Sequence, residues 1–98
     1  MIERDGNQLR VSGALTIANA AVMCEEAKGY FRGDVVVDLA AVTEVDSAAL
    51  SVLFEWQRAA LRNHGRISFR NLPESLKSLA SLYGVTDLIA SDFREAAK

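Results

Sequence analysis

The chain has 98 residues, of which 50% are hydrophobic and 24% are charged, and its formal net charge is −2. This size and balance predict one compact domain, spanning residues 1–98, with a single hydrophobic core. The basic residues are dispersed along the sequence, which disfavours binding to nucleic acid, since that function selects a basic face.

Three further features exclude other classes of protein. No apolar run approaches the roughly 20 residues that a membrane-spanning helix requires, so we expect no direct insertion into a membrane. The first ten residues, MIERDGNQLR, carry charges where a signal peptide needs an apolar stretch. The single cysteine, Cys24, cannot form a disulfide within the chain, which fits a reducing cytoplasm.

The first half of the chain predicts a hairpin, a helix and a buried strand. The segment IERDGNQLRVSG predicts two strands joined by a turn at Asp5-Gly6-Asn7. A helix is expected from about Ile17 to Phe31, with Thr16 as its N-cap. Its apolar stripe would comprise Ile17, Ala20, Ala21, Cys24, Ala27 and Phe31. The next segment, DVVVDLA, predicts a central strand that is buried on both faces.

The second half predicts two more helices and one more strand. A helix is expected from Ser47 to about His64, with Gly65 as the C′ residue that ends it. RISFR alternates as a strand does, and NLPESLKSLASLYG predicts a helix with Asn71 as its cap, Pro73 in its first turn and Gly84 as its stop. The last segment predicts a short apolar run and a polar helical tail. This order predicts an α/β domain with a mixed sheet and helices packed on it.

An enzyme is disfavoured by the distribution of reactive residues. His64, the only histidine, and Ser47 bracket one predicted helix and would lie about 25 Å apart at ~1.5 Å per residue, too far for a Ser-His-Asp arrangement. The sequence contains no glycine-rich phosphate loop and no cluster of histidine and cysteine for zinc. Cys24 lies on an apolar helical stripe, which is typical of a core residue. We therefore expect no catalytic residue, cofactor or metal site.

The stretch VTEVDSAAL, residues 42–50, places a carboxylate and a hydroxyl between a predicted strand and a predicted helix. Either Asp46 or Ser47 could cap the helix by accepting hydrogen bonds from its first N–H groups. A serine at this position could instead be phosphorylated, or could meet a partner protein directly, because the helix dipole favours added negative charge there. The residues alone favour plain capping and leave the two other roles open.

The helix expected over residues 47–64 carries two apolar strips. On a helical wheel one strip should face the sheet and comprises Leu50, Leu53, Phe54, Gln57, Ala60 and Leu61. The second strip lies roughly 180° to 260° around the wheel and comprises Ala49, Val52, Trp56 and Ala59. This second strip could pack on a neighbouring helix of the same domain. It could equally be a patch that binds a protein partner, with Trp56 as its anchor.

Taken together, these residues resemble the STAS domain family, which includes the bacterial anti-sigma-factor antagonists. The matching pieces are LRVSGALT, VVVDLAAVTEVDSAAL and RISFRNLPESLKSLASLYGV, and the resemblance covers roughly Leu9 to Ile89. It implies a single STAS-like α/β domain with a mixed sheet of four or five strands and helices mainly on one face. In phosphorylated members, a kinase-like anti-sigma factor modifies the serine that corresponds to Ser47. Those members commonly have a second small hydroxyl residue and a glycine where this chain has Ala48 and Ala49.

The third block is similar to the MlaB branch of the family, whose members are small cytoplasmic subunits of a phospholipid ABC transporter that maintains outer-membrane lipid asymmetry. The resemblance implies a non-enzymatic accessory subunit that binds the transporter's ATPase and is peripheral to the inner membrane through that complex. We expect the partner to contact Asp46, Ser47, Val52 and Trp56. The alternative is an anti-sigma-factor antagonist that is regulated by phosphorylation at Ser47. A domain of a larger sulfate-type transporter is less expected, because the chain starts with Met1 and ends in a polar segment.

Overall fold

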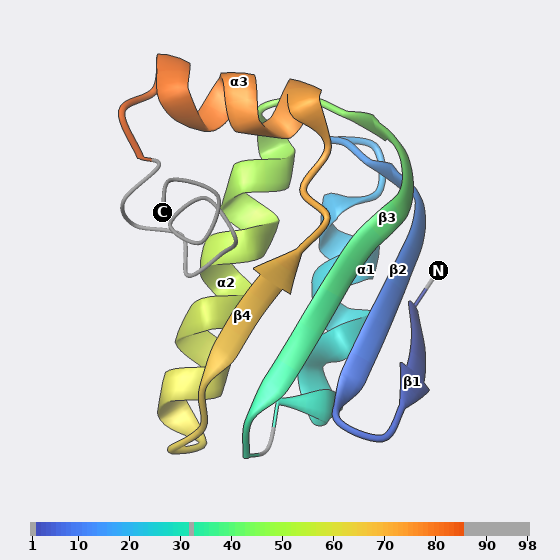
Figure 1. The fold of residues 1–98 in the computed structure, drawn as a ribbon, viewed down its shortest axis with the longest axis vertical. Helices are drawn as coiled ribbons and strands as arrows, with labels where there is room; N and C mark the ends of the chain where they lie inside the picture. The colour runs from blue at the N-terminus through green and yellow to red at the C-terminus, as the bar shows by residue number, and fades with distance from the viewer. Residues whose placement is uncertain (1, 32, 86–98) are drawn as a thin grey trace.

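The computed structural model describes residues 2–31 and 33–85, and its four strands form one mixed sheet in the order β1-β2-β3-β4 (Figure 1). The strands are β1 (Ile2–Asp5), β2 (Gln8–Leu15), β3 (Val35–Val45) and β4 (Ile67–Arg70). β1 and β2 are antiparallel, whereas β2, β3 and β4 are parallel neighbours. The sheet thus has one hairpin and two crossover connections, each of which contains a helix.

The predicted hairpin is confirmed. Asp5 pairs with Gln8, which leaves Gly6 and Asn7 as a two-residue loop. Gly6 has a φ of +63°, in the left-handed region that tight hairpin turns require and that glycine adopts without a steric penalty. The turn chemistry that is visible in the sequence therefore sets the register of the first two strands.

β3 is an interior strand, as predicted, but it is buried on one face only. Val35, Val37 and Leu39 are buried, whereas Val36 and Asp38, which point to the opposite face, are only half-buried. The prediction of burial on both faces is therefore wrong. Three consecutive valines suit either environment, and the difference arises because α1 and α2 cover the same face of the sheet (Figure 1).

The helical elements are α1 (Ala20–Ala27), the short 3₁₀ turn η1 (Lys28–Tyr30), α2 (Ala48–Arg62) and α3 (Glu74–Leu82). α3 runs across one end of the molecule, next to the start of α2 (Figure 1). One core lies between the sheet and the helices; its largest fully buried side chains are Trp56, Phe31, Phe69, Leu9, Leu15, Met23, Leu39, Leu53, Leu76, Val11 and Val37. The predicted α/β class, with a mixed sheet and helices mainly on one face, is confirmed.

α1 is shorter at its beginning than the sequence predicts. Asn19, rather than Thr16, directly precedes the helix, and its backbone carbonyl accepts a hydrogen bond from the N–H of Met23. The Asn19 side chain stabilises the preceding turn, because its Oδ1 accepts from the Thr16 N–H at 2.9 Å. As a result Ile17 lies in a loop and is 79% exposed, so its assignment to the apolar stripe is wrong.

The C-terminus of α2 also differs from the prediction. His64, with a φ of +59°, is the left-handed residue; the N–H groups of His64 and Gly65 donate to the carbonyls of Leu61 and Ala60, which is a Schellman motif. Gly65 is needed for a different reason, since a Cβ added there would collide with the backbone carbonyl oxygen of Gly33. The prediction of Gly65 as the C′ residue is therefore wrong by one position.

The end of α3 matches the prediction better than its beginning. Pro73 precedes the helix, and its carbonyl accepts hydrogen bonds from the N–H groups of Leu76 and Lys77, so it occupies the cap position expected for Asn71. Gly84, with a φ of +68°, ends the helix as predicted. The polar tail that the sequence predicts after this glycine lies outside the described residues.

Candidate functional site

The parallel pairing of β2 and β3 brings two loops to the same end of the sheet. Leu15, the last residue of β2, lies opposite Val45, the last residue of β3. The loop over residues 16–19 and the turn at Asp46-Ser47 therefore begin side by side, although about 30 positions separate them in the sequence. This end of the sheet holds the candidate site that the sequence predicts.

The carboxylate of Asp46 joins the two loops. One oxygen, Oδ1, accepts from the N–H of Ala48 at 2.8 Å and thereby caps α2. The other, Oδ2, accepts from the N–H of Ile17 at 3.0 Å. The backbone N–H of Asp46 donates to the carbonyl of Leu15 at 3.3 Å. Asp46 is thus committed to backbone groups on two elements, and its negative charge lies at the positive end of the helix dipole.

Ser47 has a different environment from its neighbour. Its side chain is exposed and makes no capping hydrogen bond with α2. The prediction that either residue could cap the helix is thereby resolved in favour of Asp46. Ser47 presents its hydroxyl at the start of a 15-residue helix, where backbone N–H groups and the dipole favour a negatively charged or hydrogen-bonding group.

Two shallow hollows flank Ser47: one lies between the start of α2 and α3, and the other lies between α2 and the residues that follow α3. One is lined by Val45, Asp46, Ser47, Ser75, Ser78, Leu79, Leu82 and Tyr83. The other is lined by Ser47, Leu50, Ser51, Phe54, Tyr83 and Val85. Among these described residues, Asp46 is the only charged side chain, and the rest are apolar side chains and hydroxyls. Ser47 and Tyr83 line both hollows, so the two form one continuous surface.

Val52 and Trp56 do not lie on this surface, and the prediction that they are exposed anchors is wrong. Val52 is 1% exposed and Trp56 is 2% exposed, because α1 covers this side of α2. The ring of Trp56 lies 6.0 Å from that of Phe31, at an interplanar angle of 44°. Trp56 Nε1 is buried without a hydrogen-bond partner among the described residues. The second apolar strip of the helix is therefore part of the core.

The large hydrophobic side chains that are exposed lie elsewhere. Among the described residues they are Ile17 (79%), Val22 (64%), Leu61 (72%), Leu82 (77%) and Tyr83 (57%). Leu82 and Tyr83 line the hollows beside Ser47, and Ile17 is hydrogen-bonded to Asp46. The sequence did not reveal these three residues: Leu82 falls in register with the buried Leu76 and the half-buried Leu79, and Ile17 fits a helical stripe.

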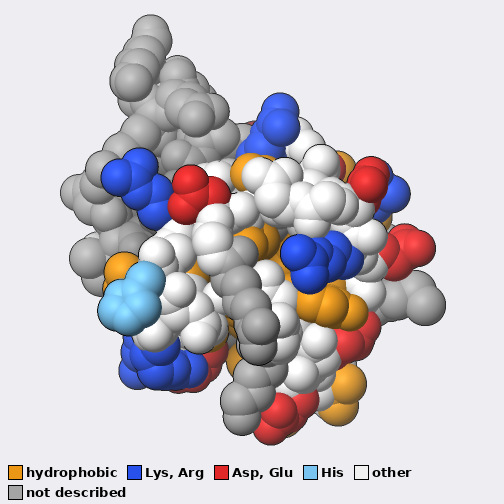
Figure 2. All heavy atoms as spheres, turned by 90° about the horizontal axis from the view of Figure 1, so that it is seen from below, with side chains coloured by type: hydrophobic (Ala, Val, Ile, Leu, Met, Phe, Trp, Pro, Cys, Tyr) orange, Lys and Arg blue, Asp and Glu red, His pale blue; other side chains and the backbone are white. Residues whose placement is uncertain are grey.

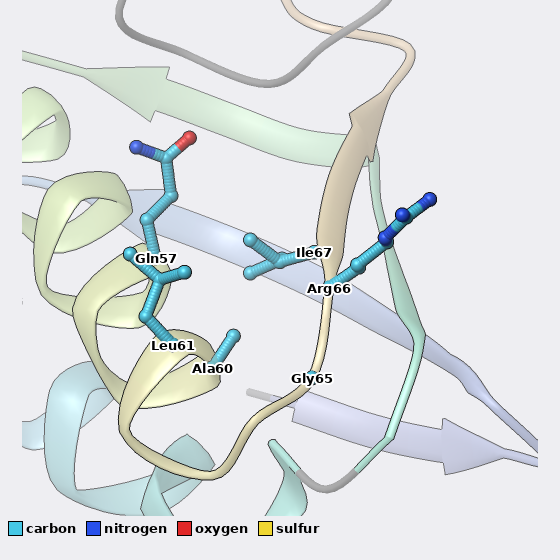
Figure 3. A pocket seen from close by; sticks show the side chains of 6 residues that line it. All are labelled: Gln57, Ala60, Leu61, Gly65, Arg66 and Ile67. Atoms are coloured by element: carbon cyan, nitrogen blue, oxygen red, sulfur yellow. The ribbon is translucent and has the colours of Figure 1, made fainter.

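The opposite end of α2 has a different character. His64 lies there among charged side chains of both signs (Figure 2), at the other end of the helix from Ser47. A groove of about 360 Å³ lies nearby between α2 and β4, lined by Gln57, Ala60, Leu61, Gly65, Arg66 and Ile67 (Figure 3). In this view Ile67 points toward α2, whereas Arg66 points away from the groove (Figure 3). The only histidine is thus far from the only serine that the sequence predicts as a site.

The remaining reactive groups lie apart from this site. Cys24 is half-buried, and burial, followed by the nearby charges of Glu55 and Glu25, raises the pKa of its thiol. Within residues 2–31 and 33–85, the His, Cys, Asp and Glu side chains form no group of three or more that could hold a metal ion. The same part of the chain contains no helix with the length and apolar character needed to span a membrane.

Comparison with solved structures identifies the fold. The anti-sigma factor antagonist SpoIIAA in its unphosphorylated form is 12% identical, with a TM-score of 0.71 over 99% of this chain and 90% of that one. A putative anti-sigma factor antagonist from Thermotoga maritima is 18% identical, with a TM-score of 0.73 and the same coverage. The phosphorylated form of the Bacillus protein SpoIIAA is 12% identical, with a TM-score of 0.66 over 99% and 94% of the two chains.

These identities are low, and the structural likeness establishes the fold alone. No curated protein sequence matches the chain. A family model does match: it is described as the Mlab STAS domain, and it covers residues 1–90. The match spans the sheet, all the described helices and the Asp46-Ser47 turn. The chain therefore belongs to the MlaB-type STAS domain family.

Proposed function

We propose that this STAS domain is a non-enzymatic accessory subunit that binds and regulates the ATPase of a phospholipid-transporting ABC complex. The family model supports this proposal, because it carries the MlaB description over residues 1–90. In this role the protein is cytoplasmic and is held at the inner membrane through the complex. It acts by binding one conformation of the ATPase more tightly than the others, which stabilises the ATPase or shifts its conformational equilibrium.

The observation that carries the proposal is the environment of Ser47. Asp46 caps α2, which leaves the Ser47 hydroxyl exposed and without a capping role. The surface around it consists of apolar side chains and hydroxyls, a composition suited to a protein interface that excludes water. A negative charge at Ser47 would have to be desolvated when this surface closes on a partner.

The test is the affinity of the purified protein for the ATPase subunit of the phospholipid ABC transporter from the same cell, measured by calorimetry. We expect binding by the unaltered protein and a loss of about tenfold or more with Ser47→Asp. Ser68→Asp is the matched control, because Ser68 is exposed on β4 and lies outside both hollows. The proposal fails if the unaltered protein does not bind, and Ser47 is not the contact if both aspartate variants bind equally.

An anti-sigma-factor antagonist is the second candidate. It is favoured by the similarity to solved antagonists, one of which is known in phosphorylated and unphosphorylated forms. In this case a partner kinase would transfer the γ-phosphoryl group of ATP to the Ser47 hydroxyl. Incubation with ATP and the cell's anti-sigma-factor kinase would then release ADP and add the mass of one phosphoryl group to the unaltered protein and none to Ser47→Ala. No mass gain at Ser47 would exclude this candidate.

A further inference from the structure

The exposed hydrophobic side chains are concentrated around one turn. Of the five large ones in the described part of the chain, Leu82 and Tyr83 line the hollows beside Ser47, and Ile17 lies in the loop that its backbone N–H joins to Asp46. They come from two parts of the chain that are far apart in sequence, the β2–α1 loop and the end of α3. An apolar group of this kind beside a polar centre is typical of a surface that another protein covers.

The Asp46 carboxylate holds the β2–α1 loop against the start of α2. Its Oδ2 fixes the backbone N–H of Ile17, while its Oδ1 fixes the N–H of Ala48 at the start of α2. Asp46 is half-buried, and each of its carboxylate oxygens already accepts a backbone hydrogen bond, so the fold fixes its orientation. Its position suits a residue that sets the place of Ile17 relative to Ser47.

We propose that Ile17, Leu82 and Tyr83 are the apolar anchors of the docking surface around Ser47, and that Asp46 is a positioning residue rather than a contact. The three anchors together with Ser47 are called the clamped surface. The inference rests on the proposed function, since the occupant is the ATPase subunit. These anchors take the place of Val52 and Trp56, which are buried, and Asp46 becomes a positioning residue instead of the partner contact that the sequence predicted.

The side chains that line the two hollows define the chemistry of the partner face that would cover them. The described residues that line the two hollows include no lysine or arginine, and their single charge is the carboxylate of Asp46. A carboxylate on the ATPase would meet a like charge there, whereas hydrogen-bond donors could pair with the hydroxyls of Ser47, Ser75 and Ser78. The ATPase therefore presents apolar side chains accompanied by N–H or O–H donors rather than by acidic groups.

The anchors are tested by calorimetry with the purified ATPase subunit. Ile17→Ser and Leu82→Ser should each weaken binding by at least about tenfold. Val22→Ser and Leu61→Ser are matched controls, because these residues are 64% and 72% exposed, lie outside both hollows and do not belong to the loop that Ile17 joins to Asp46. They should change the affinity by less than about twofold. All four residues are exposed, so we expect each variant to fold, which circular dichroism will verify.

The positioning role of Asp46 is tested with Asp46→Ser. Serine can still cap α2, but its single hydroxyl oxygen cannot also reach the N–H of Ile17. The isolated variant should show faster hydrogen exchange at the Ile17 amide. In the binding assay, Ile17→Ser should weaken binding when Asp46 is present and have much less effect when it is combined with Asp46→Ser, which a double-mutant cycle measures.

The outcomes separate this inference from the proposed function. If the unaltered protein binds the ATPase and Ser47→Asp weakens binding, but Ile17→Ser and Leu82→Ser match the controls, the clamped surface is wrong and the proposed function stands. If the Ile17 amide exchanges equally in the unaltered protein and in Asp46→Ser, or the effects of Asp46→Ser and Ile17→Ser multiply independently, Asp46 has no positioning role. Absence of binding by the unaltered protein overturns both proposals.

Discussion

The burial of Trp56 leads to a prediction about stability. Trp56 is 2% exposed and its ring packs on Phe31, so Trp56→Ala removes a large side chain from the core and leaves a cavity. Such substitutions reduce the free energy of unfolding by about 3–5 kcal/mol. For a domain with a total of about 5–15 kcal/mol, this is a large fraction.

Trp56→Phe should cost less, about 1–2 kcal/mol. Phenylalanine keeps most of the buried apolar volume, and it removes the indole N–H, which is buried without a partner among the described residues. The loss of packing is therefore partly offset by the loss of an unsatisfied donor. Leu61→Ala is the control, because this residue is 72% exposed and its replacement should change stability by no more than about 0.5 kcal/mol.

Urea unfolding followed by circular dichroism measures these differences. Trp56 is also the single tryptophan, so the fluorescence of the unaltered protein should shift to longer wavelength when the core opens. A Trp56→Ala variant that keeps the stability of the unaltered protein but loses binding to the ATPase would refute the reasoning. That result would place Trp56 on an interface instead of in the core.

Three further predictions concern the backbone and the exposed face of the sheet. Gly65→Ala should lower the free energy of unfolding by about 2 kcal/mol or more, because the added Cβ would collide with the backbone carbonyl of Gly33. Gly29→Ala is the control: a Cβ there meets nothing within 4 Å, so the variant should be neutral or slightly stabilising in the same urea titration. His64→Gly should raise the free energy of unfolding by up to about 1 kcal/mol, because glycine adopts a φ of +59° without strain; an unchanged thermal midpoint would contradict this. The hydrogen bond from Asn71 lowers the pKa of Asp38 in the folded protein. The ionised Asp38 side chain therefore contributes stability above the unfolded pKa of about 3.9, and this contribution is lost as the pH falls through the lower folded pKa. Asp38→Asn should therefore flatten the decline in stability below about pH 4, and an unaltered decline would show that other carboxylates cause it.

The elements that the sequence predicted well are those specified by local chemistry. The two-residue turn at Gly6-Asn7 and the helix stop at Gly84 depend on glycine at positions with positive φ, and both are readable from a few neighbouring residues. The interior position of β3 follows from its run of valines. The order of the elements predicted the mixed sheet, and the resemblance to the STAS family added the number of strands and the placement of helices mainly on one face.

The sequence located the candidate site, but it did not reveal the contacts that its residues make. Asp46 and Ser47 were recognisable because a strand and a helix meet there, yet the sequence could not say which of them caps α2. The bond from Ile17 to Asp46 joins residues 29 positions apart, and no periodicity reports such a contact. Likewise a helical wheel finds the strip that contains Val52 and Trp56, but it cannot show that α1 covers it.

Asp38 restricts the register in which β3 can pair with its neighbouring strands. On the solvent face its carboxylate accepts from the side chains of Gln8 at 3.2 Å and Asn71 at 2.9 Å, and thus connects β3 to β2 and to the segment after β4. A slip of β3 by one residue would turn every side chain to the other face and carry this carboxylate into the apolar interior. Burying the unpaired charge would cost several kcal/mol, while Val35 and Val37 would be moved into water. A single acidic residue on the exposed face therefore disfavours misaligned sheets during folding, and it does so without adding to the hydrophobic core.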